Sequence, residues 1–310
     1  MFVSSRFAPK ALTALAAFVL CAFVVWSMAS PPAARAESKE TDSKVCLGCH
    51  NQHPVNQILN SPHAQLADPE TPFSQGGCQT CHGDATEHLK NPATHPPRTF
   101  GPGSSTPVEK QNAVCLDCHE SDASSHWTGS THETAGVACT NCHEAHAPLQ
   151  KVKNREKQAQ VCFNCHKITR AEMHRFSHHP VIEGEVTCTD CHSPHGSFGD
   201  SLLKKATVNE TCYTCHAEKR GPFLWEHAPV REDCTICHRP HGSTQDDLLA
   251  MRGPLLCQQC HSATFHPGTL YSGDDVQPLG ADTHVIAQNC LNCHSKVHGS
   301  NHPTGVRFTR

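Results

Sequence analysis

Cysteines and histidines are the residues of this chain best able to do chemistry, and they number 21 and 27 among 310 residues. All the cysteines except Cys21 fall in C-x-x-C-H motifs, which occur ten times. In an exported protein this motif attaches c-type haem. Two thiols three residues apart can bond to both vinyl groups of one porphyrin edge, and the adjoining histidine then lies beneath the iron. The sequence therefore predicts ten covalently bound haems.

The predicted attachment cysteines are Cys46, Cys49, Cys78, Cys81, Cys115, Cys118, Cys139, Cys142, Cys162, Cys165, Cys188, Cys191, Cys212, Cys215, Cys234, Cys237, Cys257, Cys260, Cys290 and Cys293. The predicted proximal iron ligands are His50, His82, His119, His143, His166, His192, His216, His238, His261 and His294. Zinc sites or disulfides would also use paired cysteines. Neither alternative explains a histidine after every second cysteine.

The second axial ligand of each iron is predicted to be another histidine. Outside residues 1–36 the only methionines are Met173 and Met251, too few to serve ten irons. The spare histidines form two classes of five around the even-numbered motifs. The following class is His88, His146, His195, His241 and His298, and the preceding class is His63, His132, His179, His227 and His284. Ten irons can then all be six-coordinate and low-spin.

The close spacing in the following class restricts which iron each histidine can reach. His146 lies three residues after His143, and a porphyrin cannot fit between two ligands joined by so short a tether. We therefore expect His146, and by the same argument His195, His241 and His298, to bind the iron of a neighbouring haem. Such crossed ligation would hold the haems close together.

Three assignments leave alternatives open. His178 and His179 are adjacent, and the S-x-H pattern at Ser61 and Ser130 favours His179. His88 competes with His95, and His298 competes with His302. The histidines left over, which are more typical of propionate partners or solvated residues, are His53, His126, His174 and His266.

Residues 1–36 are predicted to be a cleaved secretory signal. Arg6 and Lys10 precede an uncharged apolar stretch, and Ala34-Arg35-Ala36 is a cleavage site that would leave Glu37 first. An uncleaved anchor is the alternative. The signal contains Cys21 and three of the 25 basic residues but none of the 29 acidic ones, so the remainder has a net charge of −7. This balance argues against a nucleic-acid partner. We expect a periplasmic protein.

Residues 37–310 are predicted to form one decahaem domain built from repeated haem pairs. Cys139, Cys188 and Cys234 begin similar C-T-x-C-H-x-x-H segments 49 and 46 residues apart, and such repeats stack into an elongated body. We expect mostly coil with short α-helices and little or no sheet. The best helix candidates are 107–118, with Thr106 as N-cap, and 154–165; the main loops are 91–107 and 266–281.

Haem is predicted to replace the missing apolar core, so the protein without haem should be largely unfolded. Trp127, Phe223 and Trp225 are expected to pack on haem edges. Ten six-coordinate irons indicate electron transfer with mostly negative potentials and no catalytic residue. A multihaem reductase or oxidase is less favoured, because there is no C-x-x-C-K motif and Tyr213 and Tyr271 are the only tyrosines.

The chain also resembles the decahaem cytochromes of the MtrA/DmsE/PioA/MtoA family across nearly all of residues 37–310. Besides the ten motifs, the matching segments are Thr99–Pro102, Pro194–Ser197, Trp225–Val230, Pro240–Ser243 and Val297–Pro303. The resemblance implies a wire, associated with the outer membrane, that is inserted into an outer-membrane β-barrel porin. It would connect periplasmic or inner-membrane redox proteins with an extracellular acceptor or iron(II) source. An extracellular multihaem cytochrome is a further candidate partner. A soluble periplasmic electron shuttle is the alternative.

Overall fold

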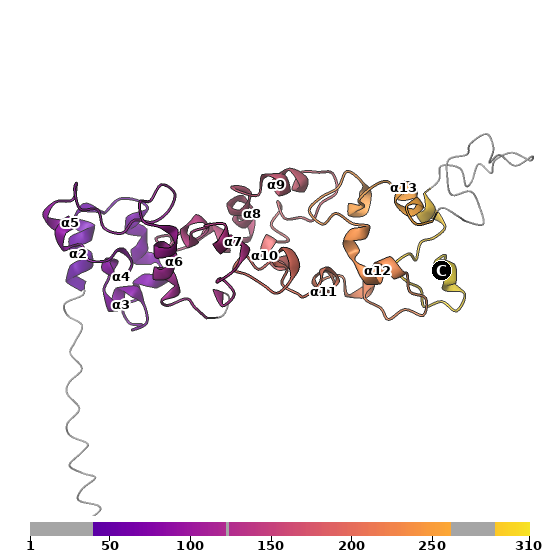
Figure 1. The fold of residues 1–310 in the computed structure, drawn as a ribbon, viewed down its shortest axis with the longest axis horizontal. Helices are drawn as coiled ribbons and strands as arrows, with labels where there is room; N and C mark the ends of the chain where they lie inside the picture. The colour runs from indigo at the N-terminus through magenta and orange to yellow at the C-terminus, as the bar shows by residue number, and fades with distance from the viewer. Residues whose placement is uncertain (1–39, 122–123, 262–288) are drawn as a thin grey trace, which may run out of the picture.

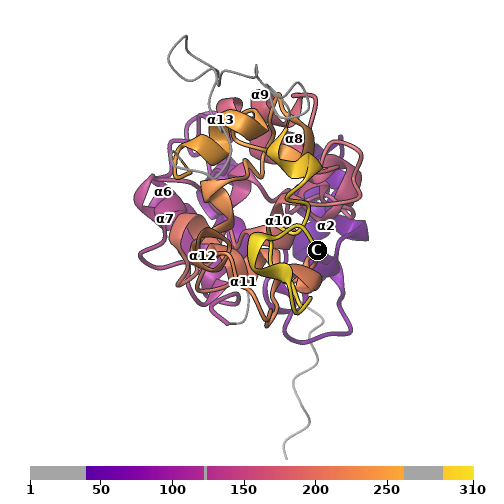
Figure 2. The ribbon, with the colours of Figure 1, turned by 90° about the vertical axis from the view of Figure 1, so that its right-hand side faces the viewer.

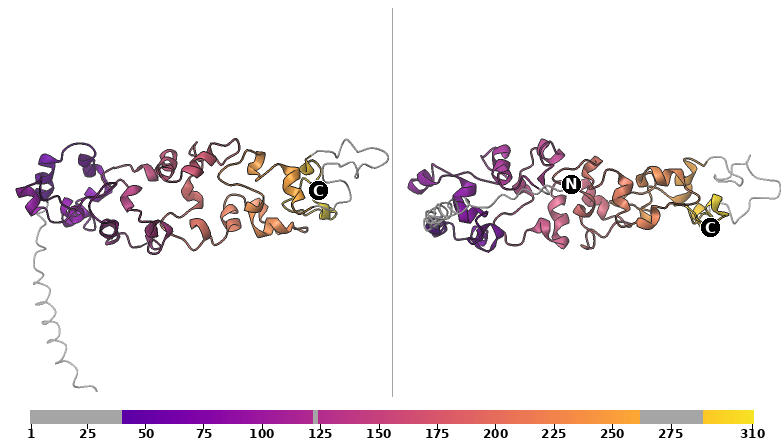
Figure 3. Two further views of the ribbon diagram at one scale, coloured as in Figure 1. Left: turned by 45° about the horizontal axis from the view of Figure 1, so that its top comes forward. Right: turned by 90° about the horizontal axis from the view of Figure 1, so that it is seen from below.

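The computed structural model describes residues 40–121, 124–261 and 289–310, which form a long rod (Figure 1). Helices α2 (Glu40–Cys49) and α5 (Thr86–Lys90) lie at one end and α13 (Gly253–Gln258) at the other. The views in Figure 3 show the same elongated outline from other sides. The predicted signal, residues 1–36, lies outside the described residues. Within the described part, no helix combines the length and apolar character required to cross a bilayer.

Short helices joined by coil make up the rod, as the sequence predicted. The remaining α-helices are α3 (Pro72–Gln75), α4 (Cys78–His82), α6 (Val108–Leu116), α7 (Thr131–Thr134), α8 (Arg155–Phe163), α9 (Lys167–Met173), α10 (Cys188–Cys191), α11 (Val208–Cys212) and α12 (Ala228–Glu232). The 3-10 helices are η2 (Val55–Asn60), η3 (Pro62–Ala64), η5 (Cys139–Asn141), η6 (Lys151–Lys153), η7 (Asp200–Leu202), η8 (Ala217–Lys219), η9 (Cys234–Ile236), η10 (Asp246–Leu248), η11 (Cys290–Asn292) and η12 (Gly305–Arg307). Helices this short are not stable alone in water.

Both predicted helices form, each with a shorter span than expected. Helix α8 begins after Asn154, whose side chain accepts a hydrogen bond from the Lys157 N–H. Helix α6 begins after Pro107, so the expected cap at Thr106 is wrong. The Thr106 hydroxyl instead accepts a hydrogen bond from the Thr99 N–H, 3.1 Å away, within the predicted loop 91–107. The predicted loop 266–281 lies outside the described residues.

Very little apolar side chain is buried in the described residues. The main cluster comprises Ala159 and Phe163 of α8, Met173 of α9, and Val181. Met173 is 4% exposed and belongs to this cluster. Viewed along the rod, the helices lie around its periphery (Figure 2). A protein core this small cannot offset the entropy lost on ordering the backbone of a chain this long.

Segments distant in sequence meet at repeated junctions, each formed by one strand-like pair of residues. Ser177 pairs with Ser243, and Trp225 pairs with Ser300, as isolated antiparallel bridges. The first residue of each bridge lies two positions before a histidine of the preceding class. The second lies two positions after a histidine of the following class. The junctions therefore connect the two classes directly. No extended sheet forms among the described residues.

Glycine permits the close approach at these junctions. Gly242 has a φ of +152°, and a Cβ there would lie 2.0 Å from the carbonyl oxygen of Glu172. Gly196 occupies the corresponding place beside the carbonyl oxygen of His126, also at 2.0 Å. Any larger residue would force the two backbones apart.

The three aromatic residues expected at haem edges have different surroundings. Trp127 is 6% exposed and packs edge-on against His195, with ring centres 6.2 Å apart. The Phe223 side chain packs directly against Gly299 and occupies the space that a Cβ at that position would need. The Trp225 indole N–H donates a hydrogen bond to the His302 carbonyl oxygen, 3.0 Å away. The haem-edge expectation stays a prediction for Phe223 and Trp225, whose contacts hold the C-terminal segment in place.

We expect Gly242→Ala to lower the thermal unfolding midpoint of the haem-loaded protein. The new methyl group would meet backbone that cannot rotate away, which costs about 1–3 kcal/mol beyond the positive-φ penalty. Gly103→Ala is the matched control, because Gly103 also has a positive φ (+80°) but no atom near its Cβ position. Circular dichroism melts of both variants test the difference, and equal losses would show that the junction tolerates a side chain.

Candidate haem sites

One continuous cavity of about 5390 Å³ is lined by residues of all ten C-x-x-C-H motifs. A cavity for a single small ligand typically measures about 300–1,000 Å³. The cavity is lined from Cys46 near one end to Thr309 near the other, so its walls include both ends of the described chain. Its size and lining fit a row of large prosthetic groups and not one substrate.

Nine of the ten motif histidines face a second histidine across this cavity. The ring centres are 6.1 Å apart in His50–His88, His82–His146, His63–His119, His132–His166, His227–His261 and His238–His298, 5.8 Å in His143–His195, 6.4 Å in His179–His216 and 6.0 Å in His192–His241. Two imidazoles on opposite sides of one metal, each bonded at about 2 Å, hold their ring centres about 6 Å apart. The spacing of these residues therefore fits one haem iron per pair.

The tenth motif histidine, His294, is described, but its predicted partner His284 lies outside the described residues, as does His266. We number the sites 1 to 10 in the order of their motifs.

The geometry distinguishes the alternatives that the sequence left open. His88 faces His50, and its Nδ1 lies 3.1 Å from the carbonyl oxygen of His95. His179 faces His216, whereas His178 contacts the Arg175 carbonyl and the Glu183 carboxylate with its two ring nitrogens. His298 faces His238, and His302 offers its carbonyl to Trp225. In each case the residue chosen from the sequence occupies the paired position.

The pairing follows a rule that spacing alone did not reveal. Each following-class histidine from His146 onward faces the motif two earlier in the sequence, as His146 faces His82. Each described preceding-class histidine faces the next odd-numbered motif, as His179 faces His216. The expectation that His146 reaches a haem other than its own agrees with this geometry. Its facing motif is not adjacent in sequence, however, so the crossing links alternate motifs. His88 is the exception and faces motif 1.

Each described preceding-class histidine is held by the residue just before a following-class histidine. Nδ1 lies 2.7 Å from the Pro194 carbonyl oxygen in His132, 2.8 Å from that of Pro240 in His179 and 3.0 Å from that of Val297 in His227. His63 makes the same bond with Ala145. Such bonds fix the tautomer and orientation of a ligating imidazole. Sequence reasoning missed them, although the residue before each following-class histidine marks their position.

The motif histidines of the even-numbered sites are held by the loops that follow them. Nδ1 lies 2.8 Å from the Arg98 carbonyl oxygen in His82, 2.9 Å from that of Ser201 in His192, 2.8 Å from that of Asp247 in His238 and 2.6 Å from that of Arg307 in His294. In His143 the partner is the Gln150 side-chain oxygen at 2.7 Å. The hydrogen-bonded histidine is therefore the partner histidine at odd-numbered sites and the motif histidine at even-numbered sites.

Two of these loops contain a turn with two consecutive strained residues. Ser201 and Leu202 both adopt the left-handed conformation, with φ of 54° and 58°, and Asp247 and Leu248 repeat it at 55° and 58°. Non-glycine residues in this region cost about 1–3 kcal/mol each. The same turn occurs twice, and each time it directs a carbonyl oxygen toward a motif histidine. The strain is therefore explained by the need to place that oxygen.

Burial favours the neutral form of several of the paired histidines. Desolvation lowers the pKa of His63, His146, His227 and His298 below the ordinary value. It also lowers the pKa of His241, where the Glu172 carboxylate, 3.6 Å from Nδ1, partly opposes the effect. Neutral imidazole is the form that binds metals, so these environments favour ligation.

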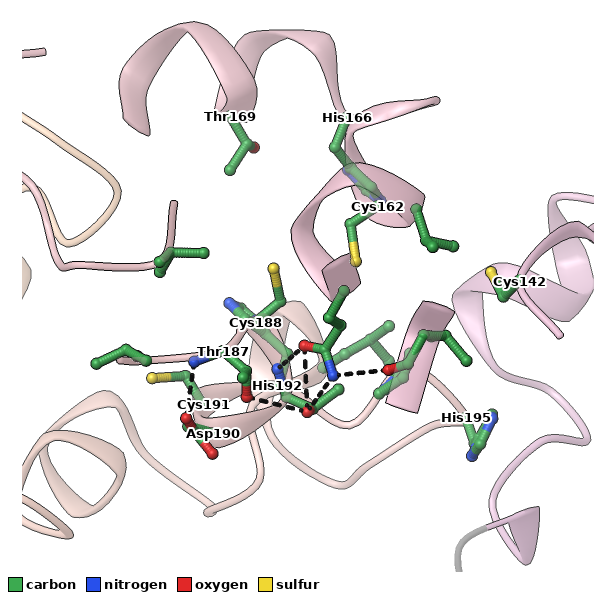
Figure 4. Close-up of a pocket in the computed structure, with 18 of the residues that line it drawn as sticks. Cys142, Cys162, His166, Thr169, Thr187, Cys188, Asp190, Cys191, His192 and His195 are labelled. Atoms are coloured by element: carbon green, nitrogen blue, oxygen red, sulfur yellow. Dashed lines mark hydrogen bonds between the residues drawn. The ribbon is translucent and has the colours of Figure 1, made fainter. Parts of the chain in front are cut away.

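The motif cysteines meet in pairs that join consecutive sites. Cys162 of α8 and Cys188 of α10 lie close together with their sulfurs in the same region (Figure 4). Before haem is attached, the Cys162 thiol donates a hydrogen bond that lowers the pKa of the Cys188 thiol to about 7. Cys212 acts in the same way on Cys234, whose pKa is also about 7. Sites 5 and 6, and likewise 7 and 8, are therefore close neighbours.

Comparison with known proteins agrees with this arrangement. A doubled CXXCH model matches residues 178–221 and 227–266, and a model of NrfB-like cytochrome c-type proteins matches 78–161. The multiheme cytochrome MtrA of Shewanella baltica (strain OS185) is 46% identical over 268 residues, which is 86% of this chain and 80% of that protein. The cytochrome c-type protein NrfB of Haemophilus influenzae is 26% identical over 152 residues, 42% of this chain and 67% of that protein.

A more distant relative shares only part of its length. The C-type polyheme cytochrome OmcB of Geobacter sulfurreducens (strain PCA) is 25% identical over 163 residues, 40% of this chain and 22% of that protein. The match to MtrA covers most of both chains. The chain therefore belongs to the MtrA family of multihaem c-type cytochromes: it binds haem c covalently through its C-x-x-C-H motifs and functions in electron transfer.

Proposed function

We propose that this cytochrome binds ten haems, each with its iron between two histidines, and that it carries electrons along the length of the rod. The observation that carries the proposal is the row of nine histidine pairs, each about 6 Å between ring centres, along one continuous cavity. Haem iron supplies a one-electron couple when bound. The residues of the chain set the spacing and orientation of these groups and restrict their exposure to water.

We assign His284 to the tenth site because it is the member of the preceding class that has no odd-numbered motif after it among the ten. The other four members precede motifs 3, 5, 7 and 9 in turn. Motif 1 is the comparable case among the described sites, since its His50 faces His88, which lies after the next motif.

Two histidines at every iron leave no position for a substrate, so we propose that the protein is not an enzyme. Methionine ligation is not needed, since Met173 is buried in the α8–α9 cluster and the Met251 sulfur accepts a hydrogen bond from Gln259. The residues proposed here position cofactors, and none is assigned a catalytic role.

We further propose that the rod lies in the periplasm and is seated in an outer-membrane β-barrel porin. It would connect periplasmic or inner-membrane redox proteins with the cell exterior, where an extracellular multihaem cytochrome, a metal acceptor or an iron(II) donor would complete the path. The elongated shape and the similarity to MtrA support this proposal. Exposed apolar side chains such as Phe176 (79%), Phe198 (90%) and Ile168 (79%) support contact with a partner.

We expect His179→Ala to convert one iron in ten of the air-oxidised protein from low-spin to high-spin. The change removes one axial ligand of site 7, opposite His216. Low-temperature EPR with near-infrared magnetic circular dichroism measures both populations. The wild-type protein should give only bis-histidine low-spin signals.

His178→Ala is the matched control, since it deletes the neighbouring imidazole and its contact with Glu183, 3.3 Å away. We expect every iron of that variant to stay low-spin. A stoichiometric high-spin signal in the control, or in the wild-type protein, would contradict the proposed ligation and reopen the possibility of catalysis.

The conduit proposal is tested with liposomes that contain an internal electron acceptor. We expect external reductant to reach this acceptor only when the cytochrome and its barrel partner are both in the membrane. Liposomes with the barrel alone control for leakage of reductant. Equal rates with and without the cytochrome would contradict the conduit and favour a soluble periplasmic shuttle.

A further inference from the structure

At every site, one imidazole hydrogen-bonds a protein oxygen, and at nine sites that oxygen belongs to the backbone. The acceptors belong to Arg98 for His82, His95 for His88, Ala145 for His63, Pro194 for His132, Ser201 for His192, Pro240 for His179, Asp247 for His238, Val297 for His227 and Arg307 for His294. Site 4 differs, because His143 contacts the side-chain oxygen of Gln150 at 2.7 Å.

The backbone of Gln150 is held by a hydrogen bond that its carbonyl oxygen accepts from the Lys153 N–H, 3.1 Å away. Gln150 is the residue before η6 and has extended backbone, and both it and His143 are partly buried and line the cavity. The nearby charges, Lys151 and Glu144, pair with each other at 2.8 Å. The amide of Gln150 is thus a neutral acceptor beside a neutralised pair.

We propose that Gln150 is a positioning residue that orients the motif histidine of site 4 and sets the reduction potential of that site. The inference rests on the bis-histidine ligation proposed above. When Nε2 of His143 binds iron, Nδ1 carries the proton and must donate, so the Gln150 oxygen is the acceptor. An acceptor at Nδ1 increases the electron density that the imidazole gives to the iron, which favours the ferric state and lowers the potential.

The side-chain acceptor makes site 4 individually adjustable. A carbonyl oxygen is present whatever residue occupies the position, so substitution cannot remove the backbone acceptor at the other nine sites. Carboxylates lie farther from Nδ1 at two of them, with Glu172 3.6 Å from His241 at site 6 and Glu218 3.8 Å from His216 at site 7. At position 150 the acceptor can be deleted or given a charge. We infer that the identity of residue 150 tunes one site in the middle of the row without altering the others.

The test compares Gln150→Leu with Gln150→Glu in the haem-loaded protein. In a potentiometric titration followed by visible absorption, about a tenth of the total absorbance change should occur at a different potential. We expect a higher potential in Gln150→Leu, where Nδ1 loses its acceptor, and a lower one in Gln150→Glu, where the acceptor gains charge. A tenfold change in the redox equilibrium constant corresponds to a displacement of about 59 mV. A merely structural role would move both variants in the same direction.

Lys151→Gln is the matched control, because it makes the same change in net charge as Gln150→Glu at the next residue but leaves the His143 contact intact. The inference would be overturned if the reduction potential did not change in either Gln150 variant, or if it changed in the same direction in both. An equal change in the control would also overturn it. EPR of the same samples separates the two proposals. A high-spin iron in the wild-type protein contradicts the ligation, whereas low-spin irons without displacement contradict only the role of Gln150.

Discussion

The rest of the structure depends on one constraint, which is that two imidazoles from different parts of the chain must face each other about 6 Å apart. The described residues have a small apolar core and no extended sheet, so these pairs are the main long-range ties. His143 and His195 are 52 positions apart in sequence, yet their ring centres lie within 5.8 Å. A metal bonded to both would close a loop that coil and short helices cannot close alone. On the proposed ligation, haem binding and folding would therefore be one event.

The rod shape follows from the direction of the crossing. If each histidine faced its own motif, the haem sites would be separate and unconnected. The following-class histidines instead face the motif two earlier in the series, as in His146, His195, His241 and His298. The preceding class faces odd-numbered motifs farther along the chain. Each unit is thus joined to the unit on either side, and repetition extends the body in one direction. The junction bridges, such as Ser177 with Ser243, lie two residues from these histidines and reinforce the same links.

The motifs, the two histidine classes and the coil-rich fold could be predicted from sequence because they follow from local chemistry. A tether of three residues is short enough to exclude self-ligation at His146, but it says nothing about which iron is reached. That choice depends on the path of the chain over some fifty residues, which spacing does not encode. The left-handed turns at Ser201 and Asp247 also escaped prediction, because neither residue is glycine. The junction contacts of Phe223 and Trp225 also escaped prediction, because aromatic character alone does not locate a chain junction.

The junctions make neighbouring sites mechanically dependent on each other. The carbonyl that accepts from His179 belongs to Pro240, so it lies in the peptide bond that leads into His241. His179 faces site 7 and His241 faces site 6, which means that one planar peptide group fixes a ligand of each. A displacement of that peptide would move both imidazoles together. The same arrangement recurs with Pro194 before His195 and with Val297 before His298. The spacing between sites is therefore set by rigid backbone, which suits a protein that must hold many cofactors in register with almost no core.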